Sequence, residues 1–134
     1  MTANRVRAGQ PAATDDRDQD VPAIISAVLD YFEGWFDGDA ERMDRALHPV
    51  LAKRSLGPDR RSLSETTATQ MIDATARGVG RDRDPGDRQI DVTVEDVHGP
   101  IANATVRSAV YREYIQLART PEGWKIVNTL WDWT

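Results

Sequence analysis

Between residues 21 and 36, apolar residues recur every three or four positions, which is the spacing of one face of an α-helix. Asp20 is placed to cap the start of this helix, and Gly38 is placed to end it in a left-handed conformation. Tyr31 and Trp35 are four residues apart, so they lie on the same edge of the apolar stripe. The stripe itself consists of Val21, Ile24, Ile25, Val28, Leu29, Phe32 and Phe36.

Two shorter helices and one short strand are predicted in the segment that follows. Asp39 can cap a second helix that runs to Leu47, and residues 50–56 fit a short strand. Residues 62–65 read Ser-Leu-Ser-Glu, which has the spacing of a capping box, and the apolar positions after them keep a helical period as far as Val79. A third helix is therefore expected to begin inside that box.

In the last third of the chain the apolar period changes from that of a helix to that of a strand. Strands are predicted over 90–95, from about 102 to 118 and over 124–133, joined by tight turns at 98–100 and 120–123. Helices followed by a long antiparallel sheet define an α+β architecture, in which three N-terminal helices pack on one face of a strongly curved sheet. Such a sheet leaves a hollow in which a small molecule can bind.

One carboxylate lies on an otherwise apolar face of the second of these strands. Glu113 shares that face with Tyr111, Ile115 and Leu117, because successive side chains of a strand point to opposite sides. Two interpretations stay open: Glu113 lies in a pocket with a raised pKa, or it pairs with an arginine on the neighbouring strand. In both, Glu113 is the best candidate for a carboxylate in the hollow.

The last strand carries aromatic residues on both of its predicted faces. One face carries Val127, Thr129, Trp131 and Trp133, and the other carries Trp124, Ile126, Asn128 and Leu130. One set is expected to line the cavity or pack on the helices, and the other is expected to face a partner subunit. Because a monomer would expose an apolar patch, this pattern predicts a homodimer formed through the sheet.

Composition narrows the class of function. The chain has 134 residues, which is the length of one domain. Its net charge is −5 and no basic patch is evident, which argues against nucleic acid as a partner. No apolar run approaches the roughly 18 residues that span a bilayer, and no apolar signal core is present. All but two of the 17 basic residues are arginines, and we interpret that bias as composition because the arginines are scattered among aspartates. The exceptions are Lys53 and Lys125.

The absence of cysteine excludes disulfides and thiolate metal sites, and it fits a cytoplasmic protein. No set of metal ligands and no phosphate-binding glycine loop is evident, so neither a metal nor a cofactor is expected. Residues 1–20 are polar, charged and almost free of large apolar side chains. They are therefore expected to form a flexible arm ahead of one folded domain at 21–134.

Three segments resemble the nuclear transport factor 2-like (NTF2-like) superfamily: Tyr31–Asp39, Ala46–Pro49 and Gly123–Asn128. They are most similar to the branch named for lumazine binding, and more distantly to SnoaL-type polyketide cyclases and ketosteroid isomerases. The resemblance covers residues 21–134 and implies a cone-shaped, cystatin-like fold whose outer sheet face commonly dimerises. Because this superfamily includes isomerases, dehydratases, cyclases, hydrolases, transport adaptors and plain ligand binders, the fold does not choose among functions.

The resemblance also implies positions for catalytic residues. The isomerases use a tyrosine on the first helix as a hydrogen-bond donor, a carboxylate base after the second helix and a protonated acid on a later strand. Tyr31 falls at the tyrosine position and Glu113 near the strand position, but the base position falls near Ser55, which disfavours ketosteroid-type proton transfer. His48 best matches the lumazine-binding branch and is an alternative acid or base, although a histidine there can equally cap the end of a helix.

Three hypotheses follow for the function. The favoured one is a pocket protein that binds a small, partly apolar or aromatic ligand, with contacts from Tyr31, Trp35, His48, Tyr111, Glu113 and Trp131. The second is a cyclase, dehydratase or isomerase with His48 or Glu113 as acid or base and Tyr31 as donor. The third is a protein-interaction module that acts through its sheet, with a cone filled by its own tryptophans.

Overall fold

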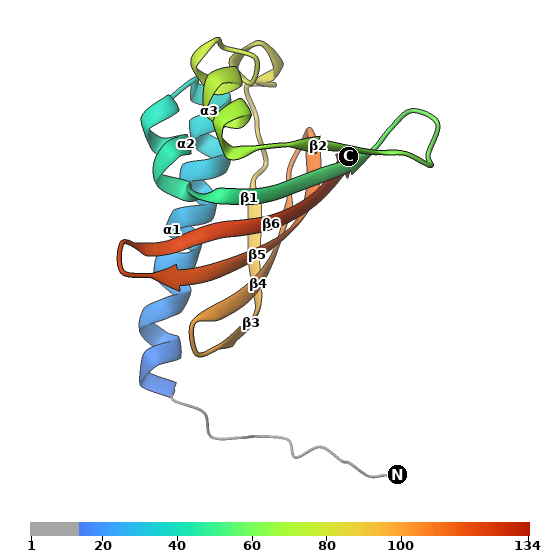
Figure 1. Cartoon of the computed structure of the whole chain (residues 1–134). Helices are drawn as coiled ribbons and strands as arrows, with labels where there is room; N and C mark the ends of the chain where they lie inside the picture. The colour runs from blue at the N-terminus through green and yellow to red at the C-terminus, as the bar shows by residue number, and fades with distance from the viewer. Residues whose placement is uncertain (1–13) are drawn as a thin grey trace, which may run out of the picture.

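The computed structural model describes residues 14–134, and these form three α-helices on one side of a six-stranded sheet. The sheet curves around α1, and α2 and α3 gather at the C-terminal end of α1 (Figure 1). The helices are α1 (Thr14–Asp37), α2 (Ala40–Ala46), α3 (Ala68–Ala76) and the short 3-10 helix η1 (Arg81–Arg83). The strands are β1 (Leu47–Leu56), β2 (Leu63–Thr66), β3 (Asp91–His98), β4 (Ile101–Arg107), β5 (Tyr111–Thr120) and β6 (Gly123–Trp133). The predicted α+β architecture is confirmed.

The strand order in the sheet is β2-β1-β6-β5-β4-β3. β1 runs parallel to β6, whereas the other neighbouring pairs described are antiparallel, so the sheet is mixed and not wholly antiparallel as predicted. The parallel pairing sets Lys53 beside Thr129, and Ser55 beside Trp131. A strand that follows the second helix is thereby placed next to the C-terminal hairpin, and both contribute to one concave face.

Helix α1 begins earlier than predicted. It starts at Thr14, so residues 14–20 are helical, and the remainder of the predicted arm lies outside the described residues. Asp20 therefore does not cap the helix. Its buried carboxylate instead accepts hydrogen bonds from Arg119 Nη1 at 3.1 Å and Trp124 Nε1 at 3.2 Å, which tie α1 to the β5–β6 hairpin. The boundary between arm and domain stays a prediction.

The caps of the next two helices agree only in part with the predicted ones. Gly38 ends α1 with a φ of 69°, and Asp39 caps α2 by accepting a backbone hydrogen bond at 3.1 Å, as predicted. The predicted capping box was wrong, because residues 63–66 pair with β1 as a strand. The capping box of α3 is formed instead by Thr67 and Gln70, whose side chains bond each other's backbone amides at 3.1 and 2.9 Å.

The predicted long strand at 102–118 is two strands. A tight turn at 108–110 separates β4 from β5: Ser108 N donates to Tyr111 O at 2.9 Å, and Tyr111 N donates to Ser108 Oγ at 2.9 Å. A serine side chain that bonds the local backbone competes with continuation of a strand, which explains the break. The predicted turns at 98–100 and 120–123 are present as the β3–β4 and β5–β6 hairpins.

A β-bulge in β6 changes which of its residues face the helices. The pairing of β6 with β5 shifts register at Val127, which is left without a partner residue on β5. Trp124 and Ile126 are buried before the bulge, and Thr129 is buried after it. The predicted division of this strand into two faces was therefore wrong, since one extra residue inverts the alternation of side chains.

The core lies between the concave face of the sheet and the three helices. Its fully buried side chains come from both layers and include Ile24, Val28, Phe36, Met43, Val106, Ile115, Leu117 and Ile126. The helical stripe and the inner face of β5 are thus packed against each other, as their apolar spacing predicted.

Within residues 14–134, no helix combines the length and the apolar character needed to cross a membrane.

Candidate ligand cavity

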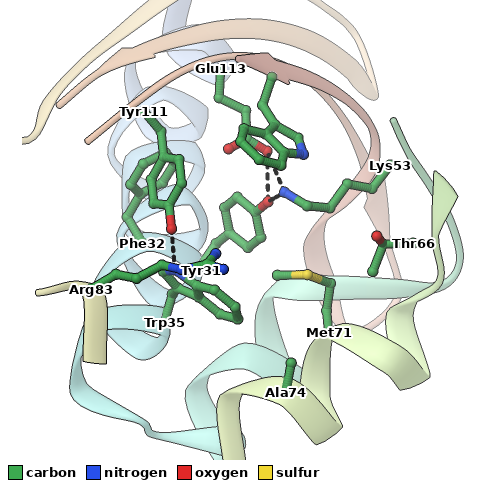
Figure 2. Close-up of a pocket in the computed structure, with 11 residues that line it drawn as sticks. Tyr31, Phe32, Trp35, Lys53, Thr66, Met71, Ala74, Arg83, Tyr111 and Glu113 are labelled. Carbon is green, nitrogen blue, oxygen red and sulfur yellow. Dashed lines mark hydrogen bonds and ion pairs between the residues drawn. The ribbon is translucent and has the colours of Figure 1, made fainter. Parts of the chain in front are cut away.

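A cavity of about 190 Å³ opens between the helices and the concave face of the sheet. The helix side is supplied by α1, α3 and η1, and the sheet side by β1, β2, β5 and β6. The lining residues are Tyr31, Phe32, Trp35, Lys53, Thr66, Met71, Ala74, Arg83, Tyr111, Glu113 and Trp131. Figure 2 shows the labelled side chains converging from these elements on one space. A cone filled by its own tryptophans, as an interaction module would require, does not fit this geometry.

Three polar side chains meet at the sheet end of the cavity. The Tyr31 hydroxyl donates a hydrogen bond of 2.6 Å to Glu113 Oε2. Lys53 Nζ donates to the Tyr31 hydroxyl and lies 3.2 Å from the same Glu113 oxygen (Figure 2). The side chains of Lys53 and Glu113 are only 9% and 3% exposed. One helix and two strands that are not neighbours in the sheet therefore meet in a single hydrogen-bonded cluster.

Burial dominates the electrostatics of this cluster. Burial raises the pKa of the Tyr31 hydroxyl well above its ordinary value, and the charge of Glu113 raises it further. Burial lowers the pKa of the Lys53 ammonium, while the Glu113 carboxylate opposes that shift. Tyr31 is therefore neutral over the physiological range, and the proton on Lys53 is held less tightly than on an exposed lysine.

Local structure explains how Lys53 reaches the cavity. In β1 the side chains of Leu51 and Lys53 are buried, whereas Ala52 between them is only partly buried and Arg54 after them is exposed, as expected for an alternating strand. Lys53 Nζ also lies 5.2 Å from the centroid of the Trp131 ring. This aromatic ring favours a positive charge at Nζ and helps to hold the side chain in place.

A second polar contact fixes the aromatic wall opposite the cluster. Trp35 Nε1 donates to the Tyr111 hydroxyl at 2.9 Å, which joins α1 to β5 (Figure 2). Gly80 lies directly against Trp35, since a Cβ at that residue would come within 2.2 Å of the Trp35 carbonyl oxygen. The Trp35 indole is thereby held between the loop after α3 and the inner face of the sheet.

Arg83 is the remaining charged residue of the lining. It extends from η1 over the cavity (Figure 2). Its guanidinium lies 5.5 Å from the centroid of the Trp133 ring. The side chain is exposed, and among the side chains described, those of residues 18–134, no carboxylate forms an ion pair with it. Because the charges of Lys53 and Glu113 offset each other, Arg83 leaves the cavity with one positive charge without a counterion.

The cavity brings together most of the residues predicted from the sequence. Tyr31, Trp35, Tyr111, Glu113 and Trp131 all line it, and their role in binding stays a prediction. The predicted burial of Glu113 on the face of β5 is confirmed. Its ionic partner is a lysine two strands away, not an arginine on the neighbouring strand as one interpretation held.

His48 is not among the residues that line the cavity. It lies near the start of β1, is partly exposed, and its Nδ1 accepts a hydrogen bond of 3.1 Å from the backbone of Val50. An acid–base or ligand-contact role for His48 in this cavity therefore has no geometric support. The reason is that α2 ends at Ala46, so the histidine belongs to the following strand and not to the last turn of a helix.

Lys53 was missed by reasoning from the sequence. Two signals pointed to it: it is one of only two lysines in an arginine-rich chain, and it shares a strand face with the apolar Leu51. Its partner across the sheet could not be predicted from the sequence, because β1 pairs in parallel with β6 through a long connection.

Within the described part of the chain, no cluster of three or more His, Cys, Asp or Glu residues is arranged to hold a metal ion.

Comparisons with known proteins agree with this fold. A family model described as "Putative lumazine-binding" matches residues 19–132. None of the curated proteins matches the sequence.

Several solved structures are similar in fold. An NTF2-like protein of unknown function from Shewanella baltica OS155 has a TM-score of 0.69 and 16% sequence identity, over 87% of this chain and 95% of that chain. An NTF2-like protein with a cystatin-like fold from Novosphingobium aromaticivorans has a TM-score of 0.66 and 18% identity, over 88% and 84%. A protein from Streptomyces avermitilis, described as "a putative dehydratase from the NTF2-like family", has a TM-score of 0.58 and 16% identity, over 87% and 97%. At these identities the similarity shows the fold alone.

The buried ion pair leads to a first prediction. Lys53→Met leaves Glu113 buried without a countercharge, so the free energy of unfolding should fall by about 3–5 kcal/mol. The double variant Lys53→Met/Glu113→Gln should recover much of that loss, because neither charge remains. Both are measured by equilibrium denaturation in urea. The matched control is Arg54→Met, on the same strand as Lys53, which breaks a solvent-exposed pair with Glu65 of β2 and should cost below about 1 kcal/mol. Equal losses for Lys53→Met and Arg54→Met would contradict the assignment.

The second prediction concerns Tyr31, whose pKa is raised above its ordinary value of 10.0. The folded chain keeps this proton where the unfolded chain releases it. The stability contributed by neutral Tyr31 is therefore fully present below pH 10 and is lost as the pH rises through the folded-state pKa. A tyrosinate absorbance titration of the folded protein should show a component well above pH 10 that Tyr31→Phe abolishes. Tyr114→Phe, at an exposed tyrosine of the outer sheet face, should retain it.

Proposed function

This chain belongs to the family described as "Putative lumazine-binding", within the NTF2-like superfamily, and we propose that its cone binds a small, mostly apolar anion of about one aromatic ring. The observation that carries the proposal is the cavity itself, whose aromatic walls end in the Tyr31–Lys53–Glu113 cluster. A concave, mainly apolar site with a few convergent polar groups is the usual form of a small-molecule site.

The size of the cavity limits the ligand. At about 190 Å³ it is somewhat larger than an apolar cavity of about 150 Å³ that accommodates benzene. It is smaller than the roughly 300–1,000 Å³ of sites for drug-sized molecules. A substituted single ring, or a compact pair of fused rings reaching out through the open side, is therefore the class that fits.

The chemistry of the walls supports a flat ligand with one polar end. Phe32, Trp35, Tyr111 and Trp131 offer ring faces and edges against which an aromatic ligand can pack. At the sheet end, Lys53 and Tyr31 supply donors for a ligand oxygen. These donors already have partners in Glu113, so a ligand oxygen there would compete with or extend an existing network.

The charge of the lining favours an acidic ligand. Lys53 and Glu113 form a neutral pair, so the guanidinium of Arg83 is the charge left for the ligand. A guanidinium binds a carboxylate through two parallel hydrogen bonds when both can approach in one plane. The proposed ligand thus carries its acidic group at the Arg83 side of the cavity and its ring against the aromatic wall.

Catalysis is the second candidate function, and it depends on the same cluster. His48 lies elsewhere, so an enzyme of the cyclase, dehydratase or isomerase kind would use Lys53 or Glu113 as acid or base and Tyr31 as donor. The three groups form a continuous hydrogen-bonded path along which a proton can move. The resemblance in fold to a protein described as a dehydratase leaves the reaction open.

Binding is testable with benzoate, which is the simplest aromatic acid of the proposed size. Because Trp35 and Trp131 line the cavity, benzoate should change the tryptophan fluorescence, whereas benzyl alcohol should bind more weakly. Arg83→Gln should weaken benzoate binding by about five- to tenfold, or roughly 1–1.4 kcal/mol. Lumazine, for which the family is named, is the natural second probe.

The control for that experiment is Arg61→Gln, which removes one positive charge from an exposed residue outside the cavity. Its affinity for benzoate should equal that of the wild type. If benzoate and benzyl alcohol bind equally well, or if Arg83→Gln leaves the benzoate affinity unchanged, the acidic-ligand proposal is wrong.

We also propose that two copies of the chain associate through the outer face of the sheet. Tyr114 and Leu130 are cross-strand partners on that face and are 53% and 49% exposed. Beside them, Asn128 Nδ2 donates to Gln116 Oε1, and Gln116 Nε2 donates to Asn103 Oδ1, at 2.9 and 3.3 Å. An apolar pair flanked by ordered amides suits an interface with a second, identical face.

Sedimentation velocity at micromolar concentration checks this association. The wild type should sediment as a dimer, and Leu130→Glu should shift it to a monomer because the charge would be buried at the interface. Thr69→Glu places the same charge on exposed α3, away from the outer sheet face, and should remain dimeric. A monomeric wild type would rule the association out.

A further inference from the structure

Lys53 places a primary amine in the cavity. We propose that Lys53 is a nucleophile that condenses with the carbonyl carbon of a small aldehyde or ketone held in the cone, forming a reversible imine. The inference rests on the proposed ligand site and adds a covalent step to it. The substrate class is thereby narrowed to carbonyl compounds of single-ring size.

A purely structural role explains Lys53 poorly. A buried ion pair is often no more stabilising than apolar residues of the same volume, so such a pair is weak evidence for a stability device. All but two of the 17 basic residues of this chain are arginines, and arginine would pair with Glu113 through two hydrogen bonds. Arginine cannot lose its proton and lysine can, and loss of the proton is what a nucleophilic amine requires.

The groups around Lys53 Nζ can take up its proton. Glu113 Oε2, 3.2 Å from Nζ, is positioned to accept the ammonium proton, and burial already lowers the pKa of Lys53. Tyr31 bonds both groups and is held neutral, so its hydroxyl can relay a proton between them. Figure 2 shows the Lys53 side chain running along the cavity wall to this hydroxyl.

The step balances in atoms and charge. Glu113 takes one proton from the Lys53 ammonium, and the neutral amine adds to the carbonyl carbon. The adduct carries a positive charge on nitrogen and a negative charge on the former carbonyl oxygen. One of the two nitrogen protons then passes through Tyr31 to that oxygen, giving a neutral carbinolamine. Protonated Glu113 returns its proton to that hydroxyl group, which leaves as water. The products are one water molecule and a protonated imine beside the Glu113 carboxylate.

The cavity also suits the product of this step. The protonated imine keeps the positive charge of the ammonium that it replaces, so the pairing with Glu113 is preserved. The Trp131 ring, 5.2 Å from Nζ, faces that charge. The aromatic walls limit the access of water, which would otherwise hydrolyse the imine.

Reductive trapping tests the proposal on the folded wild-type protein. The protein is incubated near neutral pH with 4-carboxybenzaldehyde and cyanoborohydride, and the labelled residue is identified by peptide mass spectrometry. Lys53 should be labelled at least about tenfold faster than Lys125, because a desolvated amine with a lowered pKa is the better nucleophile. Lys125 is the internal control, since it lies outside the cavity and its Nζ donates to the Arg45 carbonyl oxygen at 2.7 Å.

Three further measurements separate this chemistry from accidental labelling. In urea the advantage of Lys53 over Lys125 should disappear, because it depends on the folded cavity. Tyr31→Phe should slow the labelling of Lys53 and leave that of Lys125 unchanged, since only Lys53 uses the tyrosine relay. Excess benzoate should protect Lys53 selectively.

The outcomes distinguish the covalent step from the binding site. If benzoate changes the fluorescence but folded Lys53 is labelled no faster than Lys125, the imine proposal is overturned and the ligand site stands. If Lys53 is labelled selectively while benzoate fails to bind, the acidic-ligand proposal fails and the nucleophile stands. Selective labelling that persists unchanged in urea would overturn the claim that the cavity activates Lys53.

Discussion

The contact between Lys53, Tyr31 and Glu113 joins the first helix to two strands that are separated by a third. Each of these side chains is long, and each is buried, so their polar atoms must satisfy one another within the cone. The distance between α1 and the sheet at this level is thereby set by hydrogen-bond lengths. The cavity lies directly beside this cluster, and the three side chains of the cluster form part of its lining.

A second buried polar contact anchors the other end of α1. Asp20 accepts hydrogen bonds from Arg119 and Trp124, both of which come from the β5–β6 hairpin. The helix is therefore tied to β5 at both levels, and in addition to β6 at Asp20 and to β1 at Tyr31, while apolar residues fill the space between. This arrangement fixes the direction of α1 across the sheet, and with it the position of Tyr31 and Trp35 at the cavity.

Two irregular features of the strands, a bulge and a tight turn, determine which side chains point into the site. The bulge at Val127 turns Trp131 toward the cavity after Ile126 has been buried on the same side. The turn at Ser108 begins β5 at Tyr111, which places Tyr111 and Glu113 on the concave face. Regular strands would have curved less and would have carried part of the aromatic wall to the outer surface.

Local patterns in the sequence were sufficient to predict much of the fold and part of the site. The helical stripe of α1, the Gly38–Asp39 boundary, the two hairpin turns and the inward face of β5 depend on contacts between residues close in sequence, so their spacing is visible in the chain. Glu113 could be found because it is a carboxylate on an otherwise apolar strand face, whereas Tyr31 was identified through the family resemblance. The starts of α1 and α3 were misplaced, since several residues in each region can cap a helix and tertiary packing selects among them.

Only the tertiary structure decided which side chains meet. The parallel pairing of β1 with β6 brings Lys53 within reach of Glu113, sixty residues later in the chain, and no local signal specifies that pairing. His48, the more conspicuous residue in the sequence, lies outside the cavity because the chain has already left α2 when it reaches that position. The sequence determined most of the elements and the inward faces of α1 and β5, because these follow from residues close together in the chain. The position of Lys53 at the centre of the site follows from long-range packing.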